Sequence, residues 1–444
     1  GMLNNYKMER DAIRKYDKET PVTTNLMGTY KGLDYFKWAK EMDIVSWDNY
    51  PSYNTPWSHV AMTHDLMRGL KDAPFMLMEQ TPSQQNWQPY NSLKKPGQMR
   101  AQSYQTVAHG ADTIQFFQLR RSVGGCEKFH GAVIAHAGTA DTRVFREVTQ
   151  LGKELEKIGS RVMGSENHAK VGIIFDWENY WALEYTSGPN RDLRYVDQIE
   201  QMYNYFYNKN IAVDMIPIDA DFSKYDLVAA PVLYMVKDGV AESLEAYVQA
   251  GGTLITTYMS GIVGQSDNVH LGGYPGPLRK MAGVWVEEID ALAPEQRNKI
   301  RFADGTEEEC RLVCDLMHLE GAEEVAKYED DFYAGMTAVA KNSFGKGIVY
   351  YVGTDLYEGG LAKVLAMAAD GAAIQPVIEE ATALEITKRQ ADGEDLYFII
   401  NFKDEEIPLP AVFDGKEDIL TGGKVQGGEM LKKYDLRIVS VPRA

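Results

Sequence analysis

The fold follows from one stretch of sequence, Phe75-Met76-Leu77-Met78-Glu79-Gln80-Thr81-Pro82-Ser83. Apolar residues lead into a carboxylate at the point where a turn begins, which is the pattern of a buried strand that ends in polar groups. Burying a charge without purpose is expensive, so a carboxylate in this position calls for a function. In parallel α/β folds the functional groups stand at the ends of strands. The stretch therefore predicts a parallel strand with Glu79 at its functional end.

Strands and helices alternate on both sides of this stretch, up to about residue 160. Each predicted strand is largely apolar or β-branched and ends in polar residues, which is the rhythm of parallel strands joined by covering helices. The predicted strands are 21–25, 43–48, 75–79 and 113–117, and the predicted helices are 33–40, 58–69, 98–110 and 142–158.

Two further segments follow, and their patterns differ. Residues 166–378 continue the β-then-α alternation, which predicts a doubly wound α/β layer. Residues 379–444 contain short alternating runs separated by glycine turns and no helical period, which predicts a small antiparallel β-sandwich. In the middle segment the predicted strands are 169–175, 212–217, 227–230, 253–257 and 347–352, the predicted helices are 196–208, 238–250 and 361–373, and the stretch from about 258 to 346 is interpreted as irregular.

Composition excludes several classes of partner. Lys and Arg number 46 against 64 Asp and Glu, so the formal net charge is -18. Phosphate backbones and anionic membrane surfaces would be repelled, and we expect neither nucleic acid nor membrane as a partner. No apolar run has the length needed to span a bilayer, and the first residues lack a basic region followed by an apolar stretch. We therefore expect a cytoplasmic protein.

The three cysteines are Cys126, Cys310 and Cys314, too few and too scattered for a disulfide framework or a zinc quartet. Cys310, Cys314 and His318 stand at helical spacing and are interpreted as packing residues, because no fourth ligand is evident. We expect neither a metal nor another cofactor.

Five residues form a candidate site at the predicted strand ends. They are the carboxylate Glu79, the aromatic residues Trp87 and Tyr50, whose flat faces suit stacking on a sugar, and Glu127 and His130, which can hydrogen-bond sugar hydroxyls. Each also has a structural interpretation: a strand-end glutamate is more often solvated or salt-bridged, an aromatic ring more often packs, and Glu127 and His130 can form a hydrogen-bonded pair under a loop. Together the five match the groups that glycoside hydrolysis requires.

Several motifs resemble those of the glycoside hydrolase family forty-two β-galactosidases, and they extend along essentially the whole chain. The resemblance implies that Glu79 is the nucleophile on the seventh strand of a (β/α)8 barrel, that Trp87, Glu127 and His130 line a galactose subsite, and that Tyr50 lies beside the nucleophile. It also implies that the second, flavodoxin-like domain mediates trimer formation. The motifs are Trp47-Asp48-Asn49-Tyr50-Pro51, Met78 to Ser83 with Asn86-Trp87, Phe117 to Arg121 with Glu127 to Gly131, Phe175 to Tyr180, and Gly272 to Pro277.

The chain departs from the family pattern in one respect. The family's acid/base glutamate follows an asparagine at the end of the fourth barrel strand, and no Asn-Glu pair occurs ahead of Glu79. The resemblance therefore implies that residues 1–165 are the carboxyl-terminal half of the barrel, that an amino-terminal half is missing, and that double displacement needs a second carboxyl group from elsewhere. We expect a homo-oligomeric retaining β-galactosidase, acting on terminal β-galactosides through a galactosyl-enzyme on Glu79, whose isolated fragment is inactive or nearly so.

Other interpretations fit parts of the sequence. The alternative function is a catalytically inactive fragment that binds galactosides or serves assembly. The middle segment also resembles glutamine amidotransferases in layout, but no cysteine lies between Cys126 and Cys310 to serve as their nucleophile. The polar run 176–179 after a predicted strand is interpreted as a domain interface, and the glycines of 271–276 as a rigid loop.

Overall fold

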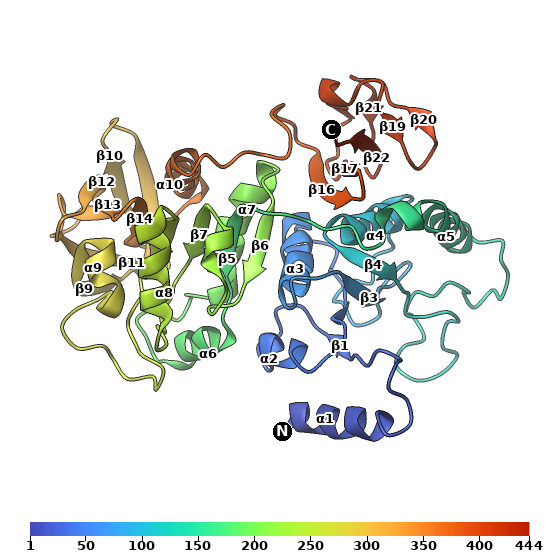
Figure 1. Cartoon of the computed structure of the whole chain (residues 1–444), viewed down its shortest axis with the longest axis horizontal. Coiled ribbons are helices and arrows are strands. Elements are labelled where there is room, and N and C mark those ends of the chain that lie inside the picture. The colour runs from blue at the N-terminus through green and yellow to red at the C-terminus, as the bar shows by residue number, and fades with distance from the viewer. Residues whose placement is uncertain (444) are drawn as a thin grey trace. The chain divides into compact units, whose positions relative to one another are not determined.

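The computed structural model describes residues 1–443, and contacts between residues group them into two compact units (Figure 1). The first unit combines residues 1–168, 207–212 and 376–444, and the second combines 169–206 and 213–375. In the described part of the chain, no helix is both long enough and apolar enough to cross a membrane. The domain boundaries expected from the sequence, 1–165, 166–378 and 379–444, stay a prediction.

A four-stranded parallel sheet with the order β1-β2-β3-β4 forms the centre of the first unit. Strand β3 has the predicted bounds, and β2 ends where predicted but is shorter. Strand β1 overlaps the predicted strand 21–25 only at Asn25, and β4 begins two residues before the predicted strand 113–117 and ends three residues before its end. Helices between consecutive strands make every crossover, which is how neighbouring strands come to run parallel. The bounds are α1 Met2–Ile13, β1 Asn25–Leu26, α2 Tyr35–Ala39, β2 Ser46–Asp48, α3 Trp57–Gly69, β3 Phe75–Glu79, α4 Gln98–Ala108, β4 Ala111–Ile114 and α5 Arg143–Val162.

Helix α4 is buried along almost its whole length, although half of its residues are polar. It packs against β4 on one side and against the carboxyl-terminal strands β16 and β17 on the other (Figure 1). Burial on two sides explains why this helix has no single apolar stripe. Several of its buried polar groups are paired, as where Gln105 donates to the side chain of Glu385 at 2.8 Å.

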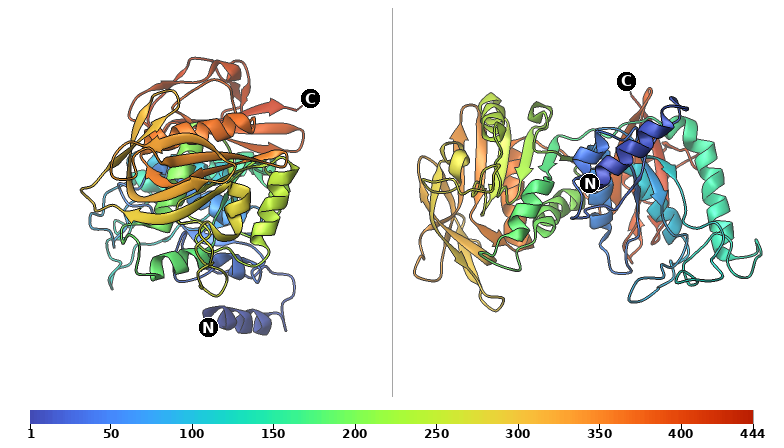
Figure 2. Two further views of the ribbon diagram at one scale, coloured as in Figure 1. Left: turned by 90° about the vertical axis from the view of Figure 1, so that its left-hand side faces the viewer. Right: turned by 90° about the horizontal axis from the view of Figure 1, so that it is seen from below.

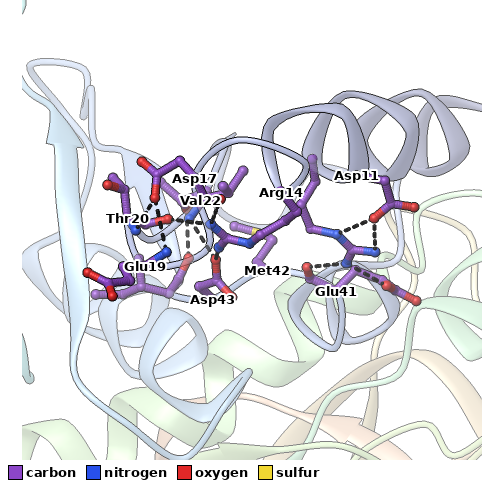
Figure 3. A network of polar contacts seen from close by, with 12 residues as sticks. Asp11, Arg14, Asp17, Glu19, Thr20, Val22, Glu41, Met42 and Asp43 are labelled. Atoms are coloured by element: carbon purple, nitrogen blue, oxygen red, sulfur yellow. Dashed lines mark hydrogen bonds and ion pairs between the residues drawn. The ribbon is translucent and has the colours of Figure 1, made fainter.

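The amino-terminal helix α1 is held by two arginines (Figure 3). Arg14 contacts the side chain of Asp43 and donates to the main-chain oxygen of Thr20 at 2.7 Å. Arg10 donates to both the side chain and the main-chain oxygen of Glu41, at 2.8 and 2.9 Å. Charge-assisted bonds of this kind are stronger than bonds between neutral groups. They tie α1 to the segment between α2 and β2.

The carboxyl-terminal strands form two antiparallel sheets, with the orders β16-β17-β22-β19-β20 and β18-β21. They enclose an apolar core that includes Ile399 and Val439 from the larger sheet and Leu431 from the smaller one. The small β domain predicted from the turn signals is present. The bounds are β16 Glu385–Ala391, β17 Glu394–Ile400, β18 Ile407–Pro408, a 3-10 turn Ala411–Phe413, β19 Glu417–Asp418, β20 Gly423–Lys424, β21 Met430–Leu431 and β22 Leu436–Pro442.

An eleven-stranded mixed sheet forms the second unit. Strands β6, β5, β7, β8 and β14 run parallel, which is the α/β layer that the sequence predicts. The bounds are β5 Val171–Ile174, α6 Trp177–Tyr185, α7 Tyr195–Asn208, β6 Val213–Ile216, a 3-10 turn Phe222–Lys224, β7 Leu227–Ala230, α8 Val240–Ala250, β8 Thr253–Thr257, a 3-10 turn Gly276–Leu278, α9 Arg279–Ala282, β9 Val284–Ala291, β10 Asn298–Phe302, β11 Glu307–Leu319, β12 Glu323–Tyr328, β13 Thr337–Phe344, β14 Gly347–Val352, β15 Thr354–Leu356 and α10 Glu358–Gly371.

The interpretation of residues 258–346 as irregular was wrong. Strands β9 to β13 lie there and extend the sheet with antiparallel pairs, visible as the yellow and orange ribbons in Figure 2. The long strand β11 begins with three glutamates and is exposed at both ends, and its longest buried run is confined to residues 313–317. Helix α6 was also missed: the polar run 176–179 is its first turn, and Asp176 caps it by accepting from the main-chain nitrogen of Asn179.

The helical spacing assigned to Cys310, Cys314 and His318 was also wrong, because all three lie on β11. Both cysteines are buried, and the Sγ atom of Cys314 lies 3.5 Å from the hydroxyl oxygen of Thr354. His318 stacks on Trp285, with 4.5 Å between the ring centroids. Among residues 1–443, no group of three or more His, Cys, Asp and Glu side chains is arranged to hold a metal ion.

Candidate active site

Glu79 is the last residue of β3, and both of its carboxylate oxygens accept hydrogen bonds from neighbouring strands. The phenol of Tyr50 donates to Oε2 at 2.8 Å, and the side-chain amide of Asn25 donates to Oε1 at 3.2 Å. Tyr50 follows β2, and Asn25 begins β1. Strands β1, β2 and β3 are consecutive in the sheet and parallel, and β1 is only two residues long, so Asn25, Tyr50 and Glu79 come together at the carboxyl-terminal edge of the sheet.

Tyr50 remains a proton donor throughout the physiological range. Burial, the hydrogen bond to Glu79 and the negative charge of Glu79 all raise the pKa of its phenol well above the usual value of 10.0. A protonated phenol that donates to a carboxylate orients that carboxylate without taking its charge away. Tyr50 therefore fixes one oxygen of Glu79 and leaves the group free to act as a nucleophile or base.

Trp87 and His130 form a stacked pair beside Tyr50. The Trp87 and His130 rings are nearly parallel, with 5.0 Å between their centroids, and the Tyr50 ring meets Trp87 edge-on at 4.9 Å. Trp87 is 51% exposed whereas His130 is fully buried. One side of the indole is therefore supported by protein, and half of its surface remains available to a ligand.

The ring nitrogens of His130 are both engaged within the protein. Nδ1 lies 3.1 Å from the side-chain oxygen of Asn86, and Nε2 lies 3.2 Å from the main-chain oxygen of Phe117. Burial lowers the pKa of this imidazole, and the Phe117 carbonyl and the charges of Glu127 and Glu79 oppose the shift. A sugar hydroxyl that contacts His130 would have to replace one of these two bonds.

Glu127 lies on the loop that carries His130, and its main-chain oxygen accepts from the His130 nitrogen at 3.0 Å. Its side chain is half-buried. It lies near enough for its charge to raise the pKa values of both Tyr50 and His130. The structure thus gathers Glu79, Tyr50, Trp87 and His130 through ring contacts and a hydrogen bond, with Glu127 at their edge.

Two residues of this cluster were missed in the sequence, Asn25 and Asp48. The amide nitrogen of Asn25 donates to Asp48 at 2.8 Å as well as to Glu79, so one amide links two carboxyl groups. Burial raises the pKa of Asp48 to about 7, the hydrogen bond from Asn25 opposes this, and the charge of Glu79 adds to it. Their positions could have identified them as site residues, because Asn25 and Asp48 are the last residues of the predicted strands 21–25 and 43–48.

A buried lysine lies behind the same turn. The ammonium of Lys94 donates to the main-chain oxygen of Thr81 at 2.5 Å, two residues beyond Glu79. Burial lowers the pKa of Lys94 to about 7. Charge on Lys94 opposes protonation of His130, so the lysine contributes to the electrostatics of the site. No feature of the sequence around Lys94 distinguishes it from its exposed neighbour Lys95.

Comparison with known proteins covers the whole chain. Residues 1–158 match the family model described as β-galactosidase, residues 169–375 the β-galactosidase trimerisation domain, and residues 383–440 the β-galactosidase C-terminal domain. The β-galactosidase BgaA of Planococcus sp. (strain 'SOS Orange') is 52% identical over 446 residues, which is 99% of this chain and 66% of that protein. The β-galactosidase LacZ of Lactobacillus acidophilus is 51% identical over 440 residues, again with 99% and 66% covered.

Solved structures of β-galactosidases are similar to this chain as well. The β-galactosidase from Bacillus circulans sp. alkalophilus superposes with a TM-score of 0.96 at 49% identity, over 99% of this chain and 66% of that one. The β-galactosidase from Rahnella sp. R3 superposes with a TM-score of 0.91 at 38% identity, over 99% of this chain and 68% of that one. The chain belongs to glycoside hydrolase family forty-two. It spans 66% of the length of these two curated family forty-two relatives.

Proposed function

We propose that this chain carries the nucleophilic part of a retaining β-galactosidase that acts on terminal β-galactosides. Glu79 would attack the anomeric carbon of galactose and form a covalent galactosyl-enzyme. The observation that supports this most directly is the pair of hydrogen bonds that Glu79 accepts from Tyr50 and Asn25 at the ends of three adjacent parallel strands. A carboxylate nucleophile must be held in one orientation, and two donors, one to each oxygen, fix the orientation of Glu79.

The neighbouring residues have complementary parts in this proposal. Trp87 offers a half-exposed ring on which the apolar face of galactose can stack. Glu127 and His130 are proposed to contact sugar hydroxyls, with His130 also supporting the Trp87 ring from beneath. Tyr50 keeps its proton, so it continues to donate to the Glu79 oxygen that does not bond to carbon. No metal or other cofactor takes part in these steps.

The catalytic cycle needs a second carboxyl group. In the first step the Glu79–galactose bond forms as the bond to the leaving oxygen breaks, and that oxygen takes a proton from the acid; in the second step water attacks and returns its proton to the same group. We assign this group to no residue of the 444. We propose that the parallel sheet β1-β2-β3-β4 represents strands five to eight of a (β/α)8 barrel, and that the acid/base belongs to strand four, in a longer polypeptide or a partner chain. These residues alone would then turn over slowly or not at all.

The proposal is tested with a substrate that does not need the missing acid. A 2,4-dinitrophenyl 2-deoxy-2-fluoro-β-galactoside has a leaving group that departs without protonation, and its fluorine slows hydrolysis of the covalent intermediate. Mass spectrometry of the intact protein is expected to show one added fluorogalactosyl group, and peptide mapping is expected to place it on residues 75–83. Labelling should be absent from Glu79→Gln.

The control is Glu178→Gln, which removes a carboxylate from the other compact unit. It should be labelled at the rate of the unaltered chain. Labelling of Glu79→Gln at an undiminished rate, or a label on any other carboxylate, would remove Glu79 from its role.

A second function is favoured by one observation, the match of residues 169–375 to the β-galactosidase trimerisation domain. A chain that serves only assembly or galactoside binding would form a homotrimer and would give no covalent adduct. Sedimentation equilibrium gives the oligomeric state. Titration with galactose, followed by the tryptophan fluorescence of the chain, then separates binding from assembly alone, because a scaffold gives no saturable change.

A further inference from the structure

A turn formed by residues 80–84 joins the end of β3 to the loop that carries His130. The main-chain oxygen of Gln84 accepts two hydrogen bonds, one from the hydroxyl of Thr81 at 3.0 Å and one from the main-chain nitrogen of Gly131 at 2.7 Å. The first bond closes the turn, and the second attaches the loop to it. The turn therefore determines how the loop stands relative to the strand of the candidate nucleophile.

The loop approaches the turn so closely because residue 131 is a glycine. A Cβ atom added to Gly131 would lie 2.6 Å from Oγ1 of Thr81 and 2.9 Å from the main-chain oxygen of Gln84. The side-chain amide of Gln84 also donates to the main-chain oxygen of Phe129 at 3.0 Å. Contacts on both sides of His130 in the sequence thus fix the loop to the turn.

Lys94 holds this turn from its buried side. The ammonium of Lys94 donates to the main-chain oxygen of Thr81 at 2.5 Å, and the residue is 6% exposed. The main-chain oxygen of Lys94 in turn accepts from the guanidinium of Arg143 at 3.0 Å, which ties the segment of the lysine to the start of α5. Lys94 therefore connects a helix outside the site to the second residue after Glu79.

A lysine in this position costs stability. Burial lowers the pKa of Lys94 to about 7, and no acidic side chain of residues 1–443 is among the groups that shift it. A buried cation without an anion is destabilising, and an apolar side chain of similar volume generally fits a buried site at least as well. Residues that cost stability without a compensating contact are expected mainly at functional sites. The cation is therefore better explained by the reaction than by the fold.

We propose that Lys94 is a positioning residue for the reaction at Glu79, because its amine fixes the Thr81 carbonyl and thereby the turn that sets the nucleophile against the loop of His130. The inference rests on the proposed function, since it takes Glu79 as the nucleophile. In this role Lys94 acts through the turn and contacts neither the sugar nor the reacting atoms. Without its hydrogen bond the turn can shift, and a small displacement of a nucleophile removes much of the rate while the sugar-binding groups stay in place.

The test measures covalent labelling by 2,4-dinitrophenyl 2-deoxy-2-fluoro-β-galactoside over a range of concentrations. Lys94→Met should lower the maximal labelling rate about 10-fold, the loss expected for one hydrogen bond from a charged donor. The concentration that gives half of the maximal rate should change less than about 2-fold, because the groups proposed to bind the sugar are unaltered. Urea unfolding of the same variant should show no loss of stability. Lys95→Met, at the exposed neighbouring lysine, is the matched control and should be labelled at the rate of the unaltered chain.

Several outcomes overturn the inference. An unchanged maximal rate in Lys94→Met shows that the turn does not need the lysine, and an equal loss in Lys95→Met shows that any lysine of this segment has the same effect. A rise in the half-maximal concentration alone assigns Lys94 to sugar binding. A Lys94→Met chain that is less stable or does not fold shows that the lysine serves the fold. Failure of the proposed function is distinguishable from all of these, because the unaltered chain then carries no label on Glu79.

Discussion

The buried histidine His109 makes the stability of the first unit depend on pH. It follows α4, and its imidazole lies between two carboxylates, with Nδ1 2.8 Å from Asp65 and Nε2 3.4 Å from Glu385. Both partners accept hydrogen bonds, so both ring nitrogens must carry protons. Burial by itself lowers the pKa of His109, but the charges and hydrogen bonds of Asp65 and Glu385 outweigh it and raise the pKa to about 9.

The size of the effect follows from the two pKa values. The folded value of about 9 and the usual value of 6.5 differ by roughly 2.5 units, which corresponds to about 3 kcal/mol of unfolding free energy. The folded chain binds the proton more tightly, so this stabilisation is fully present below pH 6.5 and is lost as the pH rises through 9. His109→Gln cannot carry the charge and should lose this dependence on pH.

The assay is urea unfolding followed by circular dichroism, at a series of pH values between about 6 and 10. Other groups titrate in the same range, but their contributions to the free energy of unfolding cancel when the unaltered chain is compared with His109→Gln at each pH. The difference in unfolding free energy should be largest at the acidic end and shrink by about 3 kcal/mol toward the alkaline end. His168→Gln, which removes a histidine whose side chain is 56% exposed, is the control for the loss of a histidine. A difference for His109→Gln that stays constant across the series would refute the buried imidazolium.

Three more predictions follow from single contacts. Tyr50→Phe removes the donor to Glu79 and should slow covalent labelling about 10- to 100-fold, measured by mass spectrometry over time; an equal rate would show that the phenol does not orient Glu79. Lys94→Met should raise the free energy of unfolding at pH 7 by at least about 1 kcal/mol in urea, because burial lowers the pKa of Lys94 to about 7 and its charged form costs stability below the usual value of 10.5; a gain that persists unchanged at pH 10.5 would contradict this. Arg389→Met should cost about 3 to 5 kcal/mol in the same assay, since the guanidinium is fully buried and donates to Asp112 and to main-chain oxygens of Val107, Ala111 and Ser165; a cost under about 1 kcal/mol would contradict it.

The parallel strands could be predicted because their signal is local. Strands β3, β7, β8 and β14 have the bounds expected from the sequence, since a strand buried on both faces is a short apolar run between turn residues. Strands β9 to β13 could not be found in this way. Their burial follows no common period, and some of their charged residues pair with charges on neighbouring strands, as where Arg301 on β10 contacts Glu307 on β11. From the sequence alone, charged residues of this kind predict a loop, because the pairing becomes evident only when the register of the two strands is known.

The residues of the site differ in the same way: some belong to local motifs, and others are brought to the site only by the register of the strands. Glu79, Tyr50 and Trp87 belong to motifs of a few consecutive residues, so the resemblance to a family could assign them. Asn25 lies 54 residues from Glu79 in the sequence. Its role depends on the strand register that pairs Asp48 with Glu79, because only then can the side-chain amide of Asn25 donate to both carboxyl groups. Burial by the fold, not neighbouring sequence, raises the pKa of Asp48 and lowers that of Lys94. A motif therefore identifies the group that reacts, whereas the groups that set its charge and orientation emerge only when the strands are placed side by side.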